Sequence, residues 1–278
     1  MPLAVRRDMH DLECMEHELL FRLLAFLGLV AVFAAAEALA PRRRRAQPRA
    51  RRWPTNWAIT ILNAATLRLM AVGLPVLAIG AALDAQANGW GLFNRLGWPD
   101  WAEIVLAVLV LDFAIWAQHL LTHKVPILWR LHRVHHADRD MDATTAFRFH
   151  PVEIALSMLL KIGVVYLIGP AAVAVLLFEI ILSGTALFNH ANWALPTGVD
   201  RALRLVLVTP DMHRVHHSVH RQEHDSNFGF ALSIWDRLFG TYVAQPAEGH
   251  DGMTVGLRWQ DDRPARLGWS LKLPFVKA

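Results

Sequence analysis

The pentapeptide "HRVHH" occurs twice in this chain, as residues 132–136 and again as residues 213–217. In an α-helix, side chains three and four residues apart lie on the same face. Each copy therefore places three imidazole rings together on one side of a helix. Because two distant segments carry the same arrangement, we expect the fold to bring both copies to one shared site.

A third histidine cluster lies upstream in "HLLTH", where His119 and His123 stand one helical turn apart. The chain has 15 histidines, and 12 of them fall between His119 and His224. A single buried histidine is usually an ordinary core residue. Many imidazoles packed together would be costly if they were protonated and unpaired, and a shared cation removes that cost. The clusters therefore predict a metal site.

The number of rings in the three clusters indicates the size of that site. The clusters supply eight histidines, whereas a structural zinc ion takes about four ligands. This number matches a pair of metal ions that keep open positions for a small molecule. Imidazole binds iron, zinc, copper and nickel, so the ligand type alone does not choose the metal.

The composition is that of a membrane protein. Hydrophobic residues make up 54% of the 278 residues and charged residues 19%, and the mean hydropathy of +0.29 is high for a soluble chain. The single cysteine, Cys14, excludes an internal disulfide and a thiolate metal cluster.

Several apolar runs are long enough to form membrane helices. The first covers residues 19–40, and the acidic residues that precede it argue against a secretory signal. The second and third cover roughly residues 57–83 and 102–121. The region 152–187 is divided by a Gly-Pro pair and has room for two short spans or one re-entrant hairpin.

The basic residues indicate the orientation in the membrane. The isoelectric point is about 9.7, and seven arginines lie in "PRRRRAQPRARRWP", residues 41–54. Positive charge directly after a span holds that side in the cytoplasm, so the histidine clusters are expected there too. We interpret the arginine run as a topology determinant that also contacts anionic lipid. A nucleic-acid partner is not expected.

Further motifs accompany the three clusters. They are "FRFHPVE" at residues 147–153, "FNHANW" at 188–193, "VTPDMHRVHHS" at 208–218 and "NFGFALSIWDRLFGTY" at 227–242. Together and in this order, they resemble the bacterial sterol-desaturase-like branch of the fatty acid hydroxylase superfamily. The resemblance covers about residues 100–245.

The resemblance implies a membrane-embedded enzyme with a non-haem di-iron centre. Such enzymes use O₂ and electrons to insert oxygen into a lipid C–H bond, or to remove hydrogen from it. Here it implies a hydroxylase that acts on a fatty acyl, sterol-like or related lipid. A lipid desaturase and an ether-lipid monooxygenase of the same superfamily are the alternatives. A pair of iron ions is the expected cofactor, with zinc as a substitute in preparations.

The resemblance also assigns metal ligands. A lone histidine before the last cluster is a ligand in relatives, and His190 of "FNHANW" takes that place. The expected ligands are therefore His119, His123, His132, His135, His136, His190, His213, His216 and His217. Three more are expected beside the metals, as further ligands or as groups around them: His150, His220 and His224.

Other polar residues are candidates for supporting roles. Asp225 and Asn227 are expected to orient ligand imidazoles, which usually donate their second N–H to an acceptor. Asp112 lies two helical turns before the first cluster, and inside a span it is either functional or a partner for a neighbouring helix. Glu153 directly follows "HP" and is expected to stabilise the first turn of a helix.

The sequence and the resemblance together predict an all-α fold. We expect an integral membrane bundle of four to five membrane helices or hairpins, with a cytoplasmic helical cap that holds a histidine-rich dimetal site. Residues 1–100 would form N-terminal membrane helices and loops, residues 101–245 the catalytic domain, and residues 246–278 a cytoplasmic tail. The expected location is the inner membrane of a bacterium, with the active site facing the cytoplasm.

The expected partners are the membrane, a lipid substrate, O₂ and a separate electron donor. The sequence has no Gly-rich dinucleotide motif opening a βαβ unit. We therefore expect a ferredoxin, a cytochrome or a reductase to supply the electrons.

A membrane metal transporter is the alternative from another class. It would need polar residues along the spans, where the sequence has few beyond Asp112, Glu179 and Arg68. A zinc-dependent membrane hydrolase is a third alternative, but the HExxH pattern of the commonest type is absent from the sequence.

Overall fold

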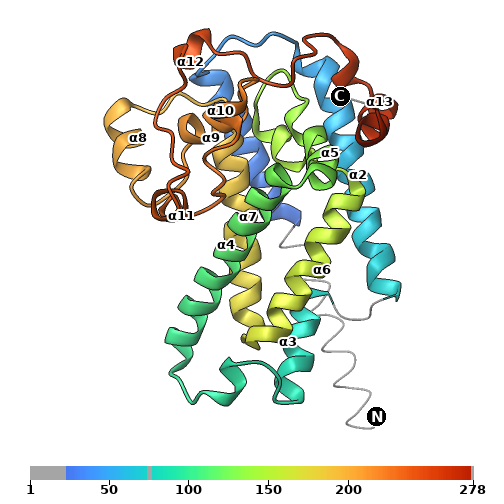
Figure 1. Cartoon of the computed structure of the whole chain (residues 1–278), viewed down its shortest axis with the longest axis vertical. Coiled ribbons are helices and arrows are strands. Elements are labelled where there is room, and N and C mark those ends of the chain that lie inside the picture. The colour runs from blue at the N-terminus through green and yellow to red at the C-terminus, as the bar shows by residue number, and fades with distance from the viewer. Residues whose placement is uncertain (1–22, 74–76, 277–278) are drawn as a thin grey trace.

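The computed structural model describes residues 23–73 and 77–276, and the regular structure of those residues is helical (Figure 1). No strand forms in these residues, and their β-type pairs are isolated bridges such as that of Leu207 with Leu232. The prediction of an all-α fold is therefore confirmed. The molecule is elongated, with long helices in one half and short helices and loops in the other.

Among the described residues, three helices are long and apolar enough to cross a membrane. They are α4 (Asp100–Lys124), α6 (Pro151–Ile168) and α7 (Ala172–His190). The ends of α4 and α7 and the start of α6 lie at the half of the molecule that holds the short helices (Figure 1). The region 152–187 thus covers most of α6 and α7, and each of these two helices is long enough to span a membrane.

A tight turn joins α6 to α7, because Gly169 adopts the left-handed conformation (φ 62°) and Pro170 follows it. The connection between α3 and α4 packs directly against this turn. A Cβ atom on Gly91 would lie 2.3 Å from the backbone nitrogen of Gly169, so only glycine fits there. Two loops far apart in the sequence thus hold this end of the bundle together.

Of the two N-terminal spans, the second differs from the prediction. The described part of the first is a helix over Leu23–Leu39, and residues 19–22 lie outside the described residues. The prediction of one continuous span over residues 57–83 is wrong, because α2 (Arg49–Gly73) ends within it and α3 (Ala78–Ala87) follows as a separate helix. In the sequence, Gly73 and Pro75 both disfavour a continuous helix at this point.

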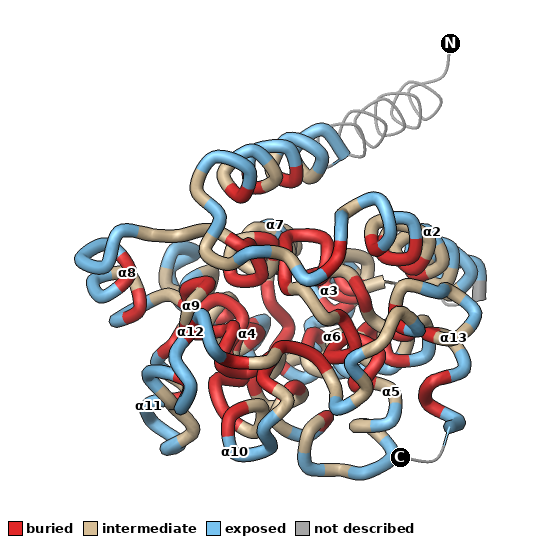
Figure 2. The backbone as a smooth tube through the Cα atoms, turned by 90° about the horizontal axis from the view of Figure 1, so that it is seen from above, coloured by how far each residue is buried: buried red, intermediate tan, exposed pale blue. Residues whose placement is uncertain are grey.

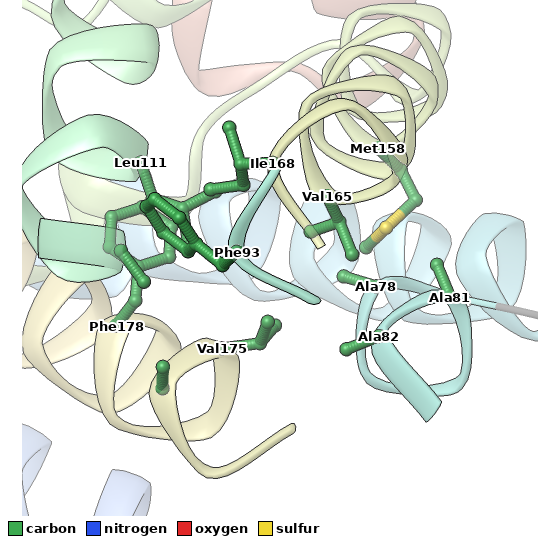
Figure 3. Close-up of a cluster of buried hydrophobic side chains, with 12 residues drawn as sticks. Ala78, Ala81, Ala82, Phe93, Leu111, Met158, Val165, Ile168, Val175 and Phe178 are labelled. Atoms are coloured by element: carbon green, nitrogen blue, oxygen red, sulfur yellow. The ribbon is translucent and has the colours of Figure 1, made fainter. Parts of the chain in front are cut away.

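A buried cluster of side chains holds α3, α4, α6 and α7 together (Figure 3). Ala78, Ala81 and Ala82 of α3 are at most 1% exposed and pack in one cluster with Val165 and Phe178. Lipid tails are as apolar as these side chains, so close packing rather than exclusion of water stabilises helix contacts in a membrane. Small alanine side chains allow this packing because they let α3 approach its neighbours.

The short helices form a cap at one end of the bundle, and η1 (Phe93–Arg95) lies at the other end, before α4. In chain order the cap contains α5 (Pro126–His136), η2 (Ala143–Phe147), α8 (Thr197–Leu203), α9 (Pro210–His216), α10 (Arg221–His224), α11 (Ile234–Leu238), α12 (Gly249–Gly252), η3 (Arg263–Ala265), α13 (Leu267–Lys272) and η4 (Leu273–Phe275). Seen from above, buried backbone lies in the middle of the cap, and outer helices such as α8 and α11 are largely exposed (Figure 2).

Part of the arginine run lies inside the protein rather than against lipid. Arg52, 1% exposed, donates to Asp138 (Nε to Oδ1, 2.6 Å) and to Asp142 (Nη1 to Oδ2, 2.8 Å). Burial would raise the pKa of Asp138, but the adjacent Arg52 guanidinium brings it down to about 2. Arg42 pairs with Asp211 of α9 at 3.1 Å. These ion pairs attach the start of α2 and the segment before it to the cap.

Candidate metal centre

Nine histidines meet where the cap covers the bundle, and they form two groups. Within each group, one nitrogen atom from every ring lies within 4.8 Å of those from the others. Site A comprises His119, His123, His132, His136 and His216, and site B comprises His135, His190, His213 and His217. These nine are the ligands expected from the sequence, and the structure brings all of them together.

Each pentapeptide divides its histidines between the two sites. The first copy contributes its outer pair, His132 and His136, to site A and His135 to site B. The second copy does the reverse, with its outer pair in site B and His216 in site A. Helix geometry explains the division. Residues i and i+4 point in similar directions, whereas residue i+3 is turned by roughly 100° from residue i+4.

Proline starts both helices that carry the pentapeptides. α5 begins at Pro126 and α9 at Pro210, where the missing N–H of proline is not needed. The Thr209 hydroxyl caps α9 by accepting a hydrogen bond from the N–H of Met212 at 3.4 Å. Both helices then lead into their histidines, and α7 likewise ends at His190. These rings therefore lie at the ends of helices that converge where the cap meets the bundle.

The ring nitrogens of the two sites are poorly satisfied by protein partners. The Nε2 atom of His190 lies 3.1 Å from the Nε2 atoms of His135 and His213. Among the described residues, both ring nitrogens of His136 and of His217 are buried without a hydrogen-bond partner. A buried polar atom without a partner costs about 1–3 kcal/mol. Converging rings with unused lone pairs fit a metal centre, which would satisfy those nitrogens.

Backbone carbonyls fix the orientation of three rings. His119 Nδ1 lies 2.7 Å from the carbonyl oxygen of Phe228, and His216 Nδ1 lies 2.7 Å from that of Ser226. His190 Nδ1 bonds the carbonyl one turn back in α7, also at 2.7 Å. A carbonyl only accepts, so each ring donates from Nδ1 and keeps its lone pair on Nε2, the atom that points into the site.

Glu153 holds His132 through a contact of 2.6 Å between Oε1 and Nδ1. Glu153 is 6% exposed and lies in the first turn of α6. A carboxylate in contact with a ligating imidazole orients the ring and raises its basicity. Sequence reasoning missed this role and expected only a helix-stabilising acid. The motif "FRFHPVE" contains Glu153, but no spacing rule connects it with a ring 21 residues earlier.

The site rings outside the membrane-capable helices are neutral at ordinary pH. Burial lowers the pKa of His132 to about 3. Burial first, and then the neighbouring imidazoles, lower the pKa well below its usual value for His135, His136, His213, His216 and His217. Metal ions bind the neutral imidazole, so these rings present lone pairs rather than protons.

The three additional histidines occupy different places. His224 borders site A, where its ring centroid lies 6.0 Å from that of His123 and its ring stacks on Trp129 at 5.3 Å. His150 instead caps α6 by accepting the N–H two residues ahead at 3.2 Å. The side chain of His220 is 52% exposed. Of the three, His224 lies beside the site, His150 acts as a helix cap and His220 lies at the surface.

A loop between α10 and α11 supplies two of the carbonyls that orient the rings. Asn227, at its centre, has a positive φ of 51°. Its side chain donates to the Met212 carbonyl at 2.8 Å and accepts from the N–H of Val243 at 2.9 Å. Asn227 therefore holds Ser226 and Phe228 in place, and it acts on the rings through their carbonyls rather than by contact with an imidazole.

The two aspartates expected near the metals contact other groups. Asp112 Oδ2 accepts a hydrogen bond from Trp235 Nε1 at 2.8 Å. Asp225 Oδ2 pairs with the ammonium group of Lys124 at 2.5 Å. Both contacts join α4 to the segment that contains α10 and α11. The two carboxylates thus hold the cap on the bundle, and these hydrogen bonds and ion pairs do not involve an imidazole, although the charge of Asp225 acts on His224.

A cavity of about 390 Å³ lies beside site A, between α2, α4, α6 and α7. His119, His132 and Glu153 line it next to the rings, and Leu67 and Leu182 line it among the long helices. Most of the lining is apolar, with a few polar groups, which is the usual character of a small-molecule site. The cavity connects the histidine centre with the membrane-capable part of the molecule.

The sequence that forms this site is similar to a known protein family. A family model described as fatty acid hydroxylase matches residues 104–241, the segment that carries both sites. Ornithine lipid hydroxylase OlsE of Rhizobium tropici is 29% identical over 245 residues, which cover 87% of this chain and 71% of that protein. A cholesterol 25-hydroxylase-like protein of Danio rerio is 27% identical over 235 residues, 80% of this chain and 88% of that protein.

A third relative is much longer than the matched region. Alkylglycerol monooxygenase of Homo sapiens is 32% identical over 172 residues, which cover 60% of this chain and 36% of that protein. The chain therefore matches little more than a third of that relative. No solved structure matches the chain.

Proposed function

This chain belongs to the fatty acid hydroxylase family, and on that premise we propose that it is a membrane-bound di-iron oxygenase that hydroxylates a C–H bond of a lipid. One observation carries the proposal: nine histidine rings converge as two groups beside a largely apolar cavity. The rings match the needs of two metal ions, and the mostly apolar lining of the cavity suits a lipid chain.

In this proposal, the five histidines of site A hold one iron ion and the four of site B hold the other. When bound, the pair supplies redox chemistry with O₂ that side chains lack. Burial keeps rings such as His132 neutral, and the chain's own groups orient them, as Glu153 does for His132. Zinc suits the same nitrogen ligands but has no redox chemistry, which makes it a substitute rather than the working ion.

The proposed reaction uses O₂, electrons and protons. One oxygen atom enters the lipid C–H bond as a hydroxyl group, and the other leaves as water with the electrons and protons. The cavity lining of α4 and α6 binds the lipid beside His119 and His132 and keeps bulk water away from the reacting carbon. Because the cavity lies between membrane-capable helices, the lipid enters without leaving apolar surroundings.

Two related outcomes use the same site. The alkylglycerol monooxygenase among the relatives favours an ether lipid as a second candidate substrate. Desaturation would remove hydrogen from the same kind of C–H bond without adding oxygen. Mass spectrometry of lipid extracts from deletion and complemented cells separates these outcomes. A hydroxylase adds an oxygen atom to one lipid, a desaturase removes hydrogen, and ether oxidation releases a shorter product.

The proposal also covers the membrane location of the enzyme, its catalytic domain and its electron donor. The arginine run lies on the same side of the molecule as the histidines, since Arg42 pairs with Asp211 in the helix that carries His213. Positive charge marks the cytoplasmic side, so we place the centre at the cytoplasmic face of a bacterial inner membrane. Residues 101–245 serve as the catalytic domain, between the N-terminal helices and a C-terminal tail. A separate ferredoxin, cytochrome or reductase supplies electrons.

Metal analysis of anaerobically purified protein tests the centre. We expect about two iron ions per chain, because each group offers enough nitrogen ligands for one ion. His135→Ala removes a site B ligand and should lower the iron content to about one ion. Less than about one metal ion in the wild-type protein, with no loss in the variant, would contradict the proposal.

A further inference from the structure

Polar side chains follow one face of α6 away from the metal centre. Glu153, Ser157 and Lys161 are spaced four residues apart and share a helix face, and all three line the cavity. Glu153 contacts the ligand His132 at 2.6 Å. With a rise of about 1.5 Å per residue, Ser157 lies roughly 6 Å and Lys161 roughly 12 Å farther along the helix.

Ser157 and Lys161, the two residues farther from the metal centre, each have a partner on a neighbouring helix. Lys161 Nζ lies 3.0 Å from Glu179 Oε1 of α7, and the Lys161 side chain is 10% exposed. Ser157 Oγ donates to Gln118 Oε1 of α4 at 3.1 Å. Gln118 also lines the cavity and directly precedes the ligand His119. Ionisable groups within membrane helices are costly and usually mark functional sites.

We propose that Ser157, Gln118 and Lys161 form a subsite that binds the acyl linkage of the substrate, an ester or amide carbonyl. This rests on the proposed function, because it requires that the cavity holds the lipid. An ammonium group carries three N–H donors, and the contact with Glu179 uses one. A carbonyl oxygen only accepts, and hydrogen bonds from charged donors are among the stronger kinds.

The ion pair also indicates the charge of the bound group. Lys161 already faces the Glu179 carboxylate at 3.0 Å, and Glu153 also lines the cavity, so a free carboxylate would be costly to bury there. A neutral carbonyl gains a hydrogen bond without adding a charge. The apolar lining, which includes Met158 and Leu182, suits the hydrocarbon of the same lipid.

The position of the subsite selects the carbon that reacts. A linkage held between Ser157 and Lys161 places atoms roughly 6–12 Å from the carbonyl beside the rings of site A. Oxidation therefore falls several carbon atoms along the chain from the linkage of an acylated lipid, rather than beside the linkage or at the far end of a long chain.

Binding of two matched probes to the full-length chain tests the subsite without turnover. A radiolabelled long-chain methyl ester and the alkane of equal length are titrated against protein in detergent, with no electron donor. We expect the wild-type chain to bind the ester roughly tenfold more tightly. K161M/E179Q should bind both probes with similar affinity. S157A, a smaller change that keeps the ion pair, should reduce the ester preference to roughly threefold.

A charge-reversed variant separates binding from a structural role of the pair. K161E/E179K keeps opposite charges on α6 and α7, and its unfolding midpoint measures how well the reversed pair replaces the original one. Its ester preference should disappear, because a cavity-facing carboxylate cannot donate to a carbonyl. K272M removes an exposed lysine at the end of α13, outside the cavity lining, and it should leave the preference unchanged.

An ester preference that survives in K161M/E179Q would overturn the subsite and leave the pair as a link between helices. If that variant does not fold, S157A and K161E/E179K decide: an unchanged preference in both overturns the subsite, and its reduction supports it. The metal proposal is tested separately. Protein that lacks iron but still prefers the ester would contradict the metal proposal and leave the subsite intact.

Discussion

His135 and His216 are each the fourth residue of their pentapeptide. Each lies in the site that contains the first and last histidines of the other pentapeptide. The ring centroid of His135 lies 4.7 Å from that of His217, and the centroid of His216 lies 4.7 Å from that of His136. Sites A and B are therefore interlocked. Neither pentapeptide completes a site alone, so displacement of either segment disturbs both.

The interlocking predicts the effect of His216→Ala, which removes a ligand of site A that comes from the second pentapeptide. Four histidines remain in site A, so we expect the affinity of this site for its ion to fall roughly 10–100-fold, and lipid oxidation to fall with it. Chelator competition followed by elemental analysis, and product mass spectrometry, measure the two effects. His220→Ala, at an exposed histidine nearby, should change neither. Wild-type metal affinity in His216→Ala would show that the ring is not a ligand.

Glu153→Gln keeps the size of the side chain but replaces the carboxyl group that contacts His132. We expect metal affinity to fall roughly 10–100-fold, as for other acidic partners of ligating histidines. Competition with a chelator measures the affinity. Glu248→Gln, at a side chain that is 52% exposed, is the control and should have no effect. If Glu153→Gln binds metal as tightly as the control Glu248→Gln, Glu153 does not support the metal site and only stabilises its helix.

Asn227→Ala should destabilise the protein by about 2–3 kcal/mol, because it removes buried hydrogen bonds and leaves a Cβ atom at positive φ. Asn227→Gly removes the same bonds but tolerates the backbone conformation, so its unfolding midpoint should lie between those of Asn227→Ala and the wild type. Both variants should bind less metal, since the carbonyls of Ser226 and Phe228 would move. A wild-type midpoint in Asn227→Ala would refute this positioning role.

The lowered histidine pKa values predict that metal-free protein becomes less stable in acid. His132 has a folded-state pKa of about 3 against a usual value of 6.5. Between these values the unfolded chain binds a proton that the folded chain does not, so stability falls as pH decreases below about 6.5. The other buried rings act in the same direction and steepen the loss. Thermal unfolding of chelator-treated protein between about pH 7 and pH 5 checks this, and constant or rising stability would contradict it.

Arg52→Met should be strongly destabilising, because it leaves Asp138 and Asp142 buried without their counter-charge. The expected loss is about 3–5 kcal/mol. Arg51, one residue earlier, is paired at the surface with its side chain 58% exposed. Arg51→Met should therefore change stability by less than about 1 kcal/mol. Unfolding midpoints in detergent compare the two variants, and equal effects would argue against the buried network.

Local sequence patterns predicted some elements well and others poorly. The run at residues 102–121 became α4 (Asp100–Lys124), and the Gly-Pro pair separated α6 from α7 as expected. The run at residues 57–83 was misread because hydropathy summed over a window does not register a break such as Gly73 and Pro75. Hydropathy also gave no sign that Arg52 would turn inward, since its partners lie 86 and 90 residues away.

The sequence by itself determined that the chain is helical, where the long apolar helices lie and which histidines stand together on a helix. These features depend on periodicity within a few residues. Only the tertiary structure decided which ring joins which site, that Glu153 supports His132, and that the carbonyls of Ser226 and Phe228 orient two rings. These contacts join segments far apart in the chain, and backbone carbonyls are present at every residue, so no local pattern encodes them.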